Sequence, residues 1–232
     1  MKVDISVIIP VLNEAARING AVEALLDQAC PGTMEVILVD GDQEGSTIHC
    51  IRDSKVIKII SEPGRGVQMN RGADIASGEI LLFLHCDTVL PKNAFHLIQT
   101  VMQNKRVKAG AFDLSIGGSA FAFRIIEKTA SLRSRLTRVP YGDQAIFIRK
   151  SCFFEWGRYK EIPIMEDVDL MRRIKREKGR ICFIGQPVIT SPRRWQKEGL
   201  LKCTLRNRLL MILYLCGKKP ETLARFYKHH AA

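Results

Sequence analysis

The sequence feature that most constrains the fold is a short apolar segment that ends in polar side chains. Five consecutive apolar residues, Ile80 to Leu84, lead directly to His85 and Asp87. This pattern is typical of a strand that is buried on both faces and carries polar side chains at its carboxyl end, where open α/β sheets bind ligands. If the strand geometry continues, His85 and Asp87 leave the backbone on the same side and can approach one cation. A packed histidine beside a solvated aspartate fits the same residues.

Units of strand, loop and helix precede this segment and imply a largely parallel sheet. The predicted elements are strands over 5–9, 35–40 and 56–60 and helices over 13–29, 48–53 and 64–78. Pro10 is expected to end the first strand because it lacks a backbone N–H, and Asn13 is expected to cap the first helix. Strands that alternate with helices favour right-handed crossovers in an α/β fold. Asp40 and Asp87 are then both expected at carboxyl ends of strands.

The second half of the chain is less regular and carries a cluster of acids. The predicted elements are helices over 92–103, 120–138 and 199–216 and strands over 110–115 and 145–148. Glu166, Asp167 and Asp169 fall in the first turn of a further helix, where the helix dipole favours negative charge. The dipole accounts for one or two of these acids, and three beside a candidate cation site indicate a functional role. No linker rich in Ser, Gly or Pro divides the chain, so we expect a single domain over residues 1–232.

The net charge of +12 is concentrated at the end of the chain. Residues 172–232 contain 16 Lys or Arg against 3 Asp or Glu, so this segment holds the whole excess. Such asymmetry indicates a phosphate-rich ligand, an anionic membrane surface or nucleic acid, or a basic face that is only solvated. Leu209 to Cys216 is an apolar run far below the ~20 residues that cross a bilayer. We expect this run to be buried in the domain or against a second subunit, in preference to lying on a membrane.

The cysteine pattern and the N-terminal sequence indicate a cytoplasmic protein. Seven cysteines occur without a C-x-x-C pair, which argues against a zinc cluster or a disulfide framework. The apolar run after Met1 is too short for the core of a signal peptide. We therefore expect a cytoplasmic chain and leave open a peripheral contact with the inner face of the membrane.

The candidate chemistry is transfer of a group away from a phosphate leaving group. The chain has no G-x-x-x-x-G-K-[ST], no G-x-G-x-x-G after the first strand and no G-x-S-x-G. These absences exclude a P-loop, a dinucleotide fingerprint and a nucleophile elbow. The acids at loop ends and the basic segment suit a divalent metal that offsets charge on a leaving diphosphate, and a carboxylate that deprotonates an incoming hydroxyl.

Five motifs occur in order along nearly the whole chain. They are Ser6–Glu14, Val39–Gly41, Gly64–Ala73, Leu81–Thr88 and Met165–Asp167. In this order they resemble the motif series of family 2 glycosyltransferases, which have a GT-A fold. The chain is especially similar to a small bacterial subgroup with a His-x-Asp-Thr motif and a later Arg-Arg-Trp, some members of which are assigned to arsenosugar biosynthesis. The resemblance implies a single α/β domain with a Rossmann-like, mostly parallel sheet flanked by helices and a basic helical C-terminal segment.

The resemblance also implies roles for individual residues. Asp87 matches the metal-binding aspartate of the family, and His85 stands where the family usually has another aspartate, so both are candidate ligands of Mg²⁺ or Mn²⁺. Glu166 and Asp167 match the pair that supplies the catalytic base, for which we favour Asp167. The residues expected to bind the nucleotide sugar are Pro10, Leu12, Asn13, Glu14, Asp40, Arg65, Gln68 and Asn70. Those expected to contact the acceptor or the diphosphate are Gly142, Asp143, Gln144, Arg194 and Trp195.

The leading hypothesis is an inverting, metal-dependent glycosyltransferase that moves a sugar from a UDP- or GDP-sugar to a hydroxyl acceptor. Residues 1–90 would form the nucleotide-binding half, 91–198 the acceptor and catalytic half, and 199–232 the C-terminal helices. One alternative is a nucleotidyltransferase of related fold, although the loop after the first strand lacks the glycine-rich Arg and Lys sequence usual there. The other is a non-enzymatic basic module that binds a membrane surface or nucleic acid, which leaves the strand-end acids unexplained. We expect no nucleic acid partner and leave open a homodimer and a membrane contact of the C-terminal helices.

Overall fold

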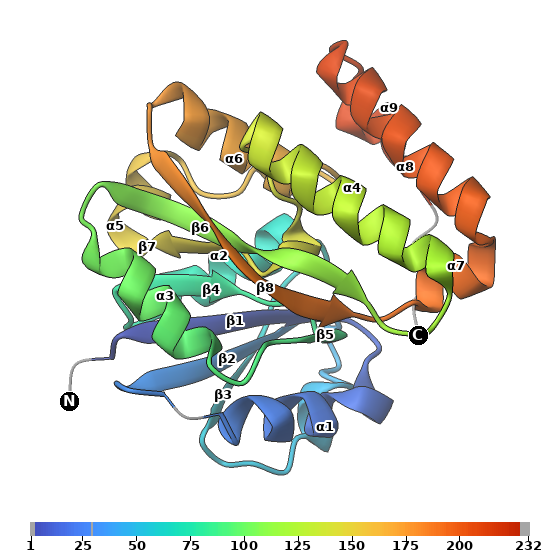
Figure 1. Cartoon of the computed structure of the whole chain (residues 1–232). Helices are drawn as coiled ribbons and strands as arrows, with labels where there is room; N and C mark the ends of the chain where they lie inside the picture. The colour runs from blue at the N-terminus through green and yellow to red at the C-terminus, as the bar shows by residue number, and fades with distance from the viewer. Residues whose placement is uncertain (1–2, 29, 228–232) are drawn as a thin grey trace.

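An eight-stranded sheet runs through the middle of the described structure, in the order β3-β2-β1-β4-β7-β6-β8-β5 (Figure 1). The computed structural model describes residues 3–28 and 30–227. β1 (Ile5–Val11) is central to the parallel half, between β2 (Met34–Asp40) and β4 (Ile80–Phe83), and β3 (Val56–Ile60) lies outside β2. The apolar side chains of β1 and β4 are buried, as expected for strands covered on both faces.

The second half of the sheet mixes strand directions. Its strands are β7 (Phe147–Arg149), β6 (Val107–Ile116), β8 (Arg180–Thr190) and β5 (Thr88–Val89). β7 is antiparallel to β4 and β6, β8 is parallel to β6, and β5 is antiparallel to β8. The predicted α/β fold with a mostly parallel sheet is confirmed, but β5 and β8 are not among the predicted strands. β8 contains Gly185-Gln186-Pro187, which interrupts its apolar pattern, and its register on β6 shifts there.

Helices cover both faces of the sheet. The helices in question are α1 (Ala15–Leu26), α2 (Arg65–Ile75), α3 (Ala94–Gln103), α5 (Lys150–Glu155) and α6 (Glu166–Arg176). α1 and α3 pack into one hydrophobic core, and α2, α5 and α6 pack into a second core on the opposite face. The strands supply alternate residues to the two cores, for example Val7 to the first and Ile8 to the second.

The C-terminal helices lie beside α4 at one edge of the molecule (Figure 1). The remaining elements are α4 (Phe121–Thr137), α7 (Arg193–Glu198), α8 (Leu200–Leu215) and α9 (Pro220–Ala224), with the 3₁₀ turns η1 (Ile48–Cys50) and η2 (Gly142–Gln144). The predicted helical C-terminal segment is therefore present. Its last residues, 228–232, lie outside the described residues, as does Ala29 at the end of the first predicted helix.

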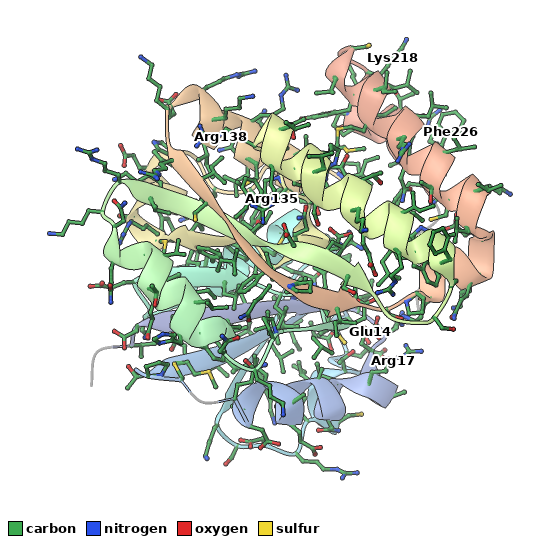
Figure 2. The ribbon with its side chains drawn as sticks, in the orientation of Figure 1. Glu14, Arg17, Arg135, Arg138, Lys218 and Phe226 are labelled. Atoms are coloured by element: carbon green, nitrogen blue, oxygen red, sulfur yellow. The ribbon has the colours of Figure 1, made fainter. Side chains whose placement is uncertain are left out.

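The apolar run near the C-terminus is not buried as a unit. Leu210 is buried, whereas Leu209, Ile212 and Leu215 are exposed. The prediction that this run packs inside the domain is therefore wrong for the outer face of α8, because only the inner face packs: Leu210 contacts Ile164 and Leu223, and Tyr214 donates to Asp169 of α6. No helix in the described ranges is long and apolar enough to cross a membrane. Lys218 and Phe226 extend from the chain beyond α8 (Figure 2).

Two predictions at the end of the first strand are wrong. Pro10 lies inside β1 and pairs with Val39. Since β4 pairs with β1 only as far as Ile8, the missing N–H of Pro10 lies where one side of the strand has no paired neighbour. Asn13 does not cap α1, which begins at Ala15. Instead Asn13 adopts a left-handed conformation (φ 57°), which asparagine tolerates better than most residues.

The chain also turns earlier than expected after β4. The strand ends at Phe83, and the Thr88 N–H donates to the His85 carbonyl at 3.0 Å. His85 and Asp87 therefore belong to a turn, and the assumption of continued strand geometry is wrong. The turn nevertheless brings both side chains to one pocket.

Candidate functional site

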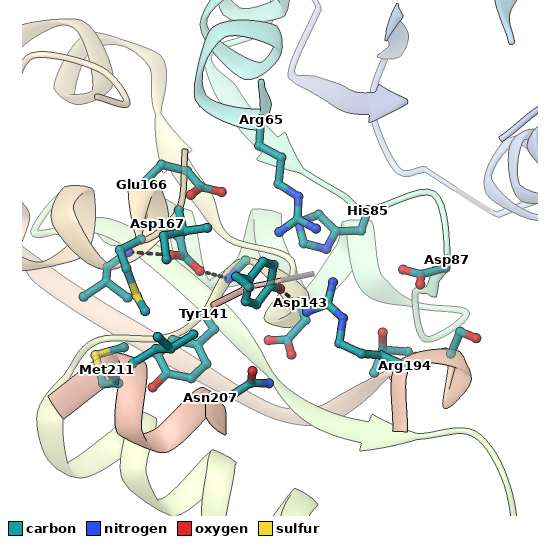
Figure 3. Close-up of a pocket in the computed structure, with 18 of the residues that line it drawn as sticks. Arg65, His85, Asp87, Tyr141, Asp143, Glu166, Asp167, Arg194, Asn207 and Met211 are labelled. Atoms are coloured by element: carbon teal, nitrogen blue, oxygen red, sulfur yellow. Dashed lines mark hydrogen bonds between the residues drawn. The ribbon is translucent and has the colours of Figure 1, made fainter. Parts of the chain in front are cut away.

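A pocket lies past the carboxyl ends of β4 and β8, between η2, the first turn of α6, α7 and α8 (Figure 3). Its volume is about 220 Å³. The predicted functional residues that line it are Arg65, His85, Asp87, Gly142, Asp143, Glu166, Asp167, Arg194 and Trp195. The fold thus gathers the predicted metal, catalytic and acceptor residues in one place.

The acid pair lies at the start of α6, where Met165 has a left-handed conformation (φ 70°). The Asp167 carboxylate accepts the Gly142 N–H at 2.5 Å and the Val168 N–H at 2.7 Å. Burial raises the pKa of Asp167, and these two N–H groups oppose the rise. Burial and the neighbouring Asp167 raise the pKa of Glu166 to about 7. Both acids of the pair therefore have a pKa above that of an ordinary carboxyl.

A third carboxyl faces the same pocket from η2. The Asp143 Oδ1 atom is buried and accepts no hydrogen bond from the described residues. Burial, followed by the charge of Asp167, raises the pKa of Asp143 to about 6, while Arg133 opposes the rise. A buried acceptor without a partner at a pocket wall is suited to receive a donor from a ligand.

Positive charge and a neutral imidazole lie opposite these acids. Burial lowers the pKa of Arg65, but Tyr227, Glu166 and other neighbours raise it by more, so the guanidinium stays charged. Burial and then Arg65 lower the pKa of His85 to about 4, so its imidazole is neutral at neutral pH. Arg194 donates to the Tyr227 hydroxyl and lies 4.8 Å above its ring. The pocket therefore offers fixed cations to an anionic ligand.

One arginine connects the two halves of the chain at the pocket edge. Arg193 Nη2 donates to Asp87 Oδ2 at 3.0 Å and to Glu14 Oε1 at 3.1 Å. Glu14 belongs to the loop after β1, and Arg193 begins α7. This bridge fixes the position of Asp87 and places the loop after β1 next to the pocket.

The donor set fits a metal shared with a substrate, not a protein cage. Across the described residues, no group of three or more His, Cys, Asp or Glu side chains can hold a metal ion. Mg²⁺ is commonly bound by one or two carboxylates together with substrate phosphates. Asp87 lies at the pocket wall, and its charge acts on the pKa of the neighbouring neutral His85. The two side chains fit a site of this kind.

Gly142 keeps space open in the centre of the pocket. A Cβ atom at this position would lie 3.1 Å from His85 Nε2 and 3.5 Å from Asp167 Oδ2. Any side chain would therefore occupy the space between the imidazole and the acid. Glycine also lets the Gly142 N–H approach the Asp167 carboxylate.

Several predicted nucleotide-binding residues are bonded within the protein. The buried Asp40 carboxylate accepts the backbone N–H groups of Asp42, Thr47 and Ile48. Gln68 donates to the carbonyls of Val11 and Val39, both at 2.8 Å. The Asn70 amide exchanges two hydrogen bonds with the Tyr159 backbone. These three side chains hold loops around the site and do not line the pocket.

The other predicted residues fall into two groups. Gln144 accepts from Ser134 Oγ and donates to the Phe112 carbonyl, so it anchors η2 from behind. Pro10, near the end of β1, is partly exposed, and Leu12 and Asn13 are exposed on the loop that follows; none of the three lines the pocket.

The sequence analysis gives no role to several pocket residues. The residues concerned are Ile164, Met165, Thr190, Ser191, Arg193, Lys197, Asn207, Leu210, Met211 and Tyr227. Arg193 follows Ser191-Pro192, a turn sequence, and is the first residue of the Arg-Arg-Trp motif, and these are the sequence signals that mark it. Tyr141 begins the stretch 141–144 that the sequence marks as a candidate acceptor segment, and it also lines the pocket, with the Arg133 guanidinium 3.4 Å from the centre of its ring.

The strand order and the pocket beyond the strand ends define a GT-A type of fold. A solved structure of TarS residues 1–349 from S. aureus has a TM-score of 0.61 and 19% identity, and the match covers 82% of this chain and 61% of TarS 1–349. The same TarS fragment in complex with UDP-GlcNAc has a TM-score of 0.59 at 18% identity, over 81% of this chain and 58% of that one. At these identities the likeness shows the fold.

The chain belongs to the family described as glycosyl transferase family 2, whose sequence model matches residues 6–163. The PGL/p-HBAD biosynthesis glycosyltransferases of Mycobacterium tuberculosis and Mycobacterium bovis are 35% identical over 92 residues, which is 37% of this chain and 36% of theirs. The chain thus spans about a third of the length of these curated relatives. The family match ends before Glu166, and the His-x-Asp-Thr subgroup stays a prediction.

Proposed function

We propose that the chain transfers a sugar, with inversion, from a nucleoside diphosphate sugar to a hydroxyl acceptor. The observation that carries this proposal is the Asp167 carboxylate, which two backbone N–H groups hold at the wall of a pocket that also presents Arg65 and Arg194. Membership of glycosyl transferase family 2 supports the reaction class. The TarS structures with UDP-GlcNAc and with UDP support a nucleoside diphosphate as the donor group.

In the proposed reaction Asp167 is the general base. It takes the proton of the acceptor hydroxyl while that oxygen bonds to the anomeric carbon and the bond to the diphosphate breaks. Attack from the side opposite the diphosphate inverts the configuration at that carbon. A base titrates most usefully near the working pH, and burial raises the pKa of Asp167 in that direction. Glu166 lies next to it, and the charge of Asp167 helps to raise the pKa of Glu166 to about 7.

The diphosphate is proposed to lie against Arg65 and Arg194, and near a metal held by Asp87. The two guanidinium groups stabilise the charge that grows on the leaving diphosphate. Asp87, with His85 beside it, would hold Mg²⁺ or Mn²⁺, which adds positive charge at the same place when bound. Asp143, whose Oδ1 has no described partner, is proposed to accept a hydroxyl of the sugar or of the acceptor.

The nucleoside is proposed to bind along the loop after β1 and beside Asp40, within residues 1–90. Glu14 is held next to the pocket by Arg193, and Leu12 is exposed on the same loop. Gln68 and Asn70 would act by shaping this surface, since their amides are bonded to the backbone. Residues 91–198 would then supply the base and the acceptor contacts.

The donor assignment is tested by isothermal titration of UDP and GDP with Mg²⁺ or Mn²⁺. We expect one nucleotide to bind, and more tightly with metal than with EDTA. Failure of both nucleotides to bind with either metal would contradict the proposal.

The base assignment is tested with Asp167→Asn. We expect transfer to fall by about 10²–10⁴-fold while nucleotide binding is retained, because the amide cannot accept the proton. Asp113→Asn is the matched control, since that carboxylate pairs with Arg135 away from the pocket and is not expected to affect transfer. Joint loss of transfer and nucleotide binding in Asp167→Asn would indicate a structural role instead.

A further inference from the structure

α4 presents a row of large apolar side chains to solvent. The row consists of Phe121, Ile125, Leu132 and Leu136, which recur at helical spacing. Phe121 is 78% exposed and Leu136 is 75% exposed, so neither packs against the described protein. Single exposed apolar residues are ordinary, but a row along a whole helix is not.

α8 presents a second row of the same kind. Its members are Leu201, Leu205, Leu209, Ile212 and Leu215, again on one face of the helix. The opposite face of α8 contributes Asn207, Leu210 and Met211 to the pocket wall. The outer face of α8 is therefore apolar although it does not pack into the core of the domain.

The two helices are in contact, and the surface formed by both rows is here called the α4–α8 surface. The helices run side by side (Figure 1), and Arg208, within the α8 row, donates to Thr129 of α4 at 3.4 Å. Thr129 lies between Ile125 and Leu132 on α4. Phe226, which follows α9, is a further apolar side chain with 63% exposure, and Figure 2 shows it and Lys218 on the side of the molecule formed by the C-terminal helices.

The exposed charges that the two helices carry on this surface have one sign. Lys128 lies among the apolar residues of α4, and Lys202 and Arg208 lie among those of α8, whereas Arg135 of α4 is already paired with Asp113 of β6. α8 contains no acid, and the one acid of α4, Glu127, is buried and accepts from Ser115 and the Ile116 N–H. Neither helix therefore exposes a carboxylate, and the partner must be both apolar and anionic.

We propose that the α4–α8 surface docks the protein on an anionic lipid bilayer. The interface of such a bilayer accepts apolar side chains and attracts Lys and Arg at the same depth. A second copy of this chain would bring like charges together without a carboxylate to pair them. Nucleic acid offers phosphates but no place for two rows of leucine-type side chains. The proposal does not depend on the proposed sugar transfer.

Docking is tested by sedimentation of the full chain with vesicles of phosphatidylcholine alone or mixed with phosphatidylglycerol. We expect binding to the anionic vesicles only, and weaker binding when salt is raised from about 0.1 to about 0.5 M. Leu205→Gln with Leu209→Gln should lower the partition coefficient roughly tenfold or more, since two apolar side chains no longer enter the interface. Lys128→Gln with Lys202→Gln should lower it less and reduce the salt dependence.

The matched control replaces two exposed apolar residues elsewhere, Ile57 and Ile60 of β3, by threonine. Binding of this variant should equal that of the original chain. The proposal is overturned if the original chain does not sediment with anionic vesicles at low salt, or if all variants bind equally. It is also overturned if sedimentation velocity shows a dimer that Leu205→Gln with Leu209→Gln dissociates and vesicles are not bound, because the surface then serves a second copy.

Discussion

Two aspartates with buried oxygens, Asp40 and Asp143, have opposite surroundings. The Asp40 carboxylate accepts three backbone N–H groups from the loop that follows β2. Asp143 Oδ1 accepts none from the described residues and faces the pocket. Asp40 ends β2 and Asp143 lies in the turn η2 before β7, and the sequence proposes a functional role for both, so it is the packing around them that distinguishes them. An acid whose acceptors are filled by the backbone builds the scaffold, and one whose acceptors are empty is available to a ligand.

A single helix shows the same division. Arg65, at the first turn of α2, points into the pocket, whereas Gln68 and Asn70 one turn later bond to the backbone of neighbouring segments (Figure 3). The predicted nucleotide-binding segment therefore contains one residue that faces the pocket and two that hold loops in place.

The largest expected effect comes from removal of the Asp40 carboxylate, whose oxygens accept hydrogen bonds from the backbone. Asp40→Ala leaves three backbone N–H groups, two of them in buried hydrogen bonds, without an acceptor and should lower the free energy of unfolding by about 3 to 5 kcal/mol. Asp143→Ala should change it by no more than about 1 kcal/mol, since no protein hydrogen bond is lost. Urea denaturation of both variants measures the contrast. Equal losses would show that the two acids do not differ as their hydrogen bonds indicate.

The next effect concerns pH and Glu166. Its pKa rises from the ordinary 4.5 to about 7 on folding, so the folded state binds more protons between these values. Stability is therefore lost as pH rises through this window. Glu166→Gln, which mimics the neutral acid, should match the original chain at pH 4 and exceed it by about 2 to 3 kcal/mol at pH 8. Thermal unfolding from pH 4 to 8 measures this, and a gap that does not change with pH would refute it.

A smaller effect distinguishes the two ends of the α2 motif. Gln68→Met removes the donor from two buried carbonyls and should cost about 1 to 2 kcal/mol of stability, with nucleotide affinity little changed. Arg65→Met should weaken nucleotide binding and leave the free energy of unfolding little changed. Urea denaturation and nucleotide titration of the same two variants distinguish a residue that stabilises the fold from one that contacts the nucleotide. Loss of nucleotide affinity in Gln68→Met alone would reverse the assignment.

The first half of the fold was predictable because strong local signals agree with the packing. The predicted strand over 56–60 has the same first and last residues as β3. The buried strands β1, β2 and β4 follow from continuous apolar runs. β8 was not predictable in this way, since Gly185 and Pro187 interrupt its pattern and its pairing with β6 forms across a register shift. Pairing of that kind depends on partners distant in the sequence.

The site was predictable as a set of residue types but not as contacts. Asp87, Asp143 and Asp167 reach one pocket as expected. No local pattern shows that Arg193 bridges Asp87 to Glu14, because that contact joins segments that fold separately. The exposure of the α8 row was also missed, since an apolar run predicts burial unless its surroundings are known.

The bridge from Arg193 to Glu14 has a consequence for how the molecule is made. Its two residues are separated by 179 positions in the chain. At about 5–20 residues per second of synthesis, Arg193 is added roughly 10 to 35 s after Glu14. The strands around β1 can pair during that interval, but Glu14 cannot form its ion pair until Arg193 has been added. A nascent chain that contains the parallel sheet should therefore acquire a finished pocket only as one of its last steps.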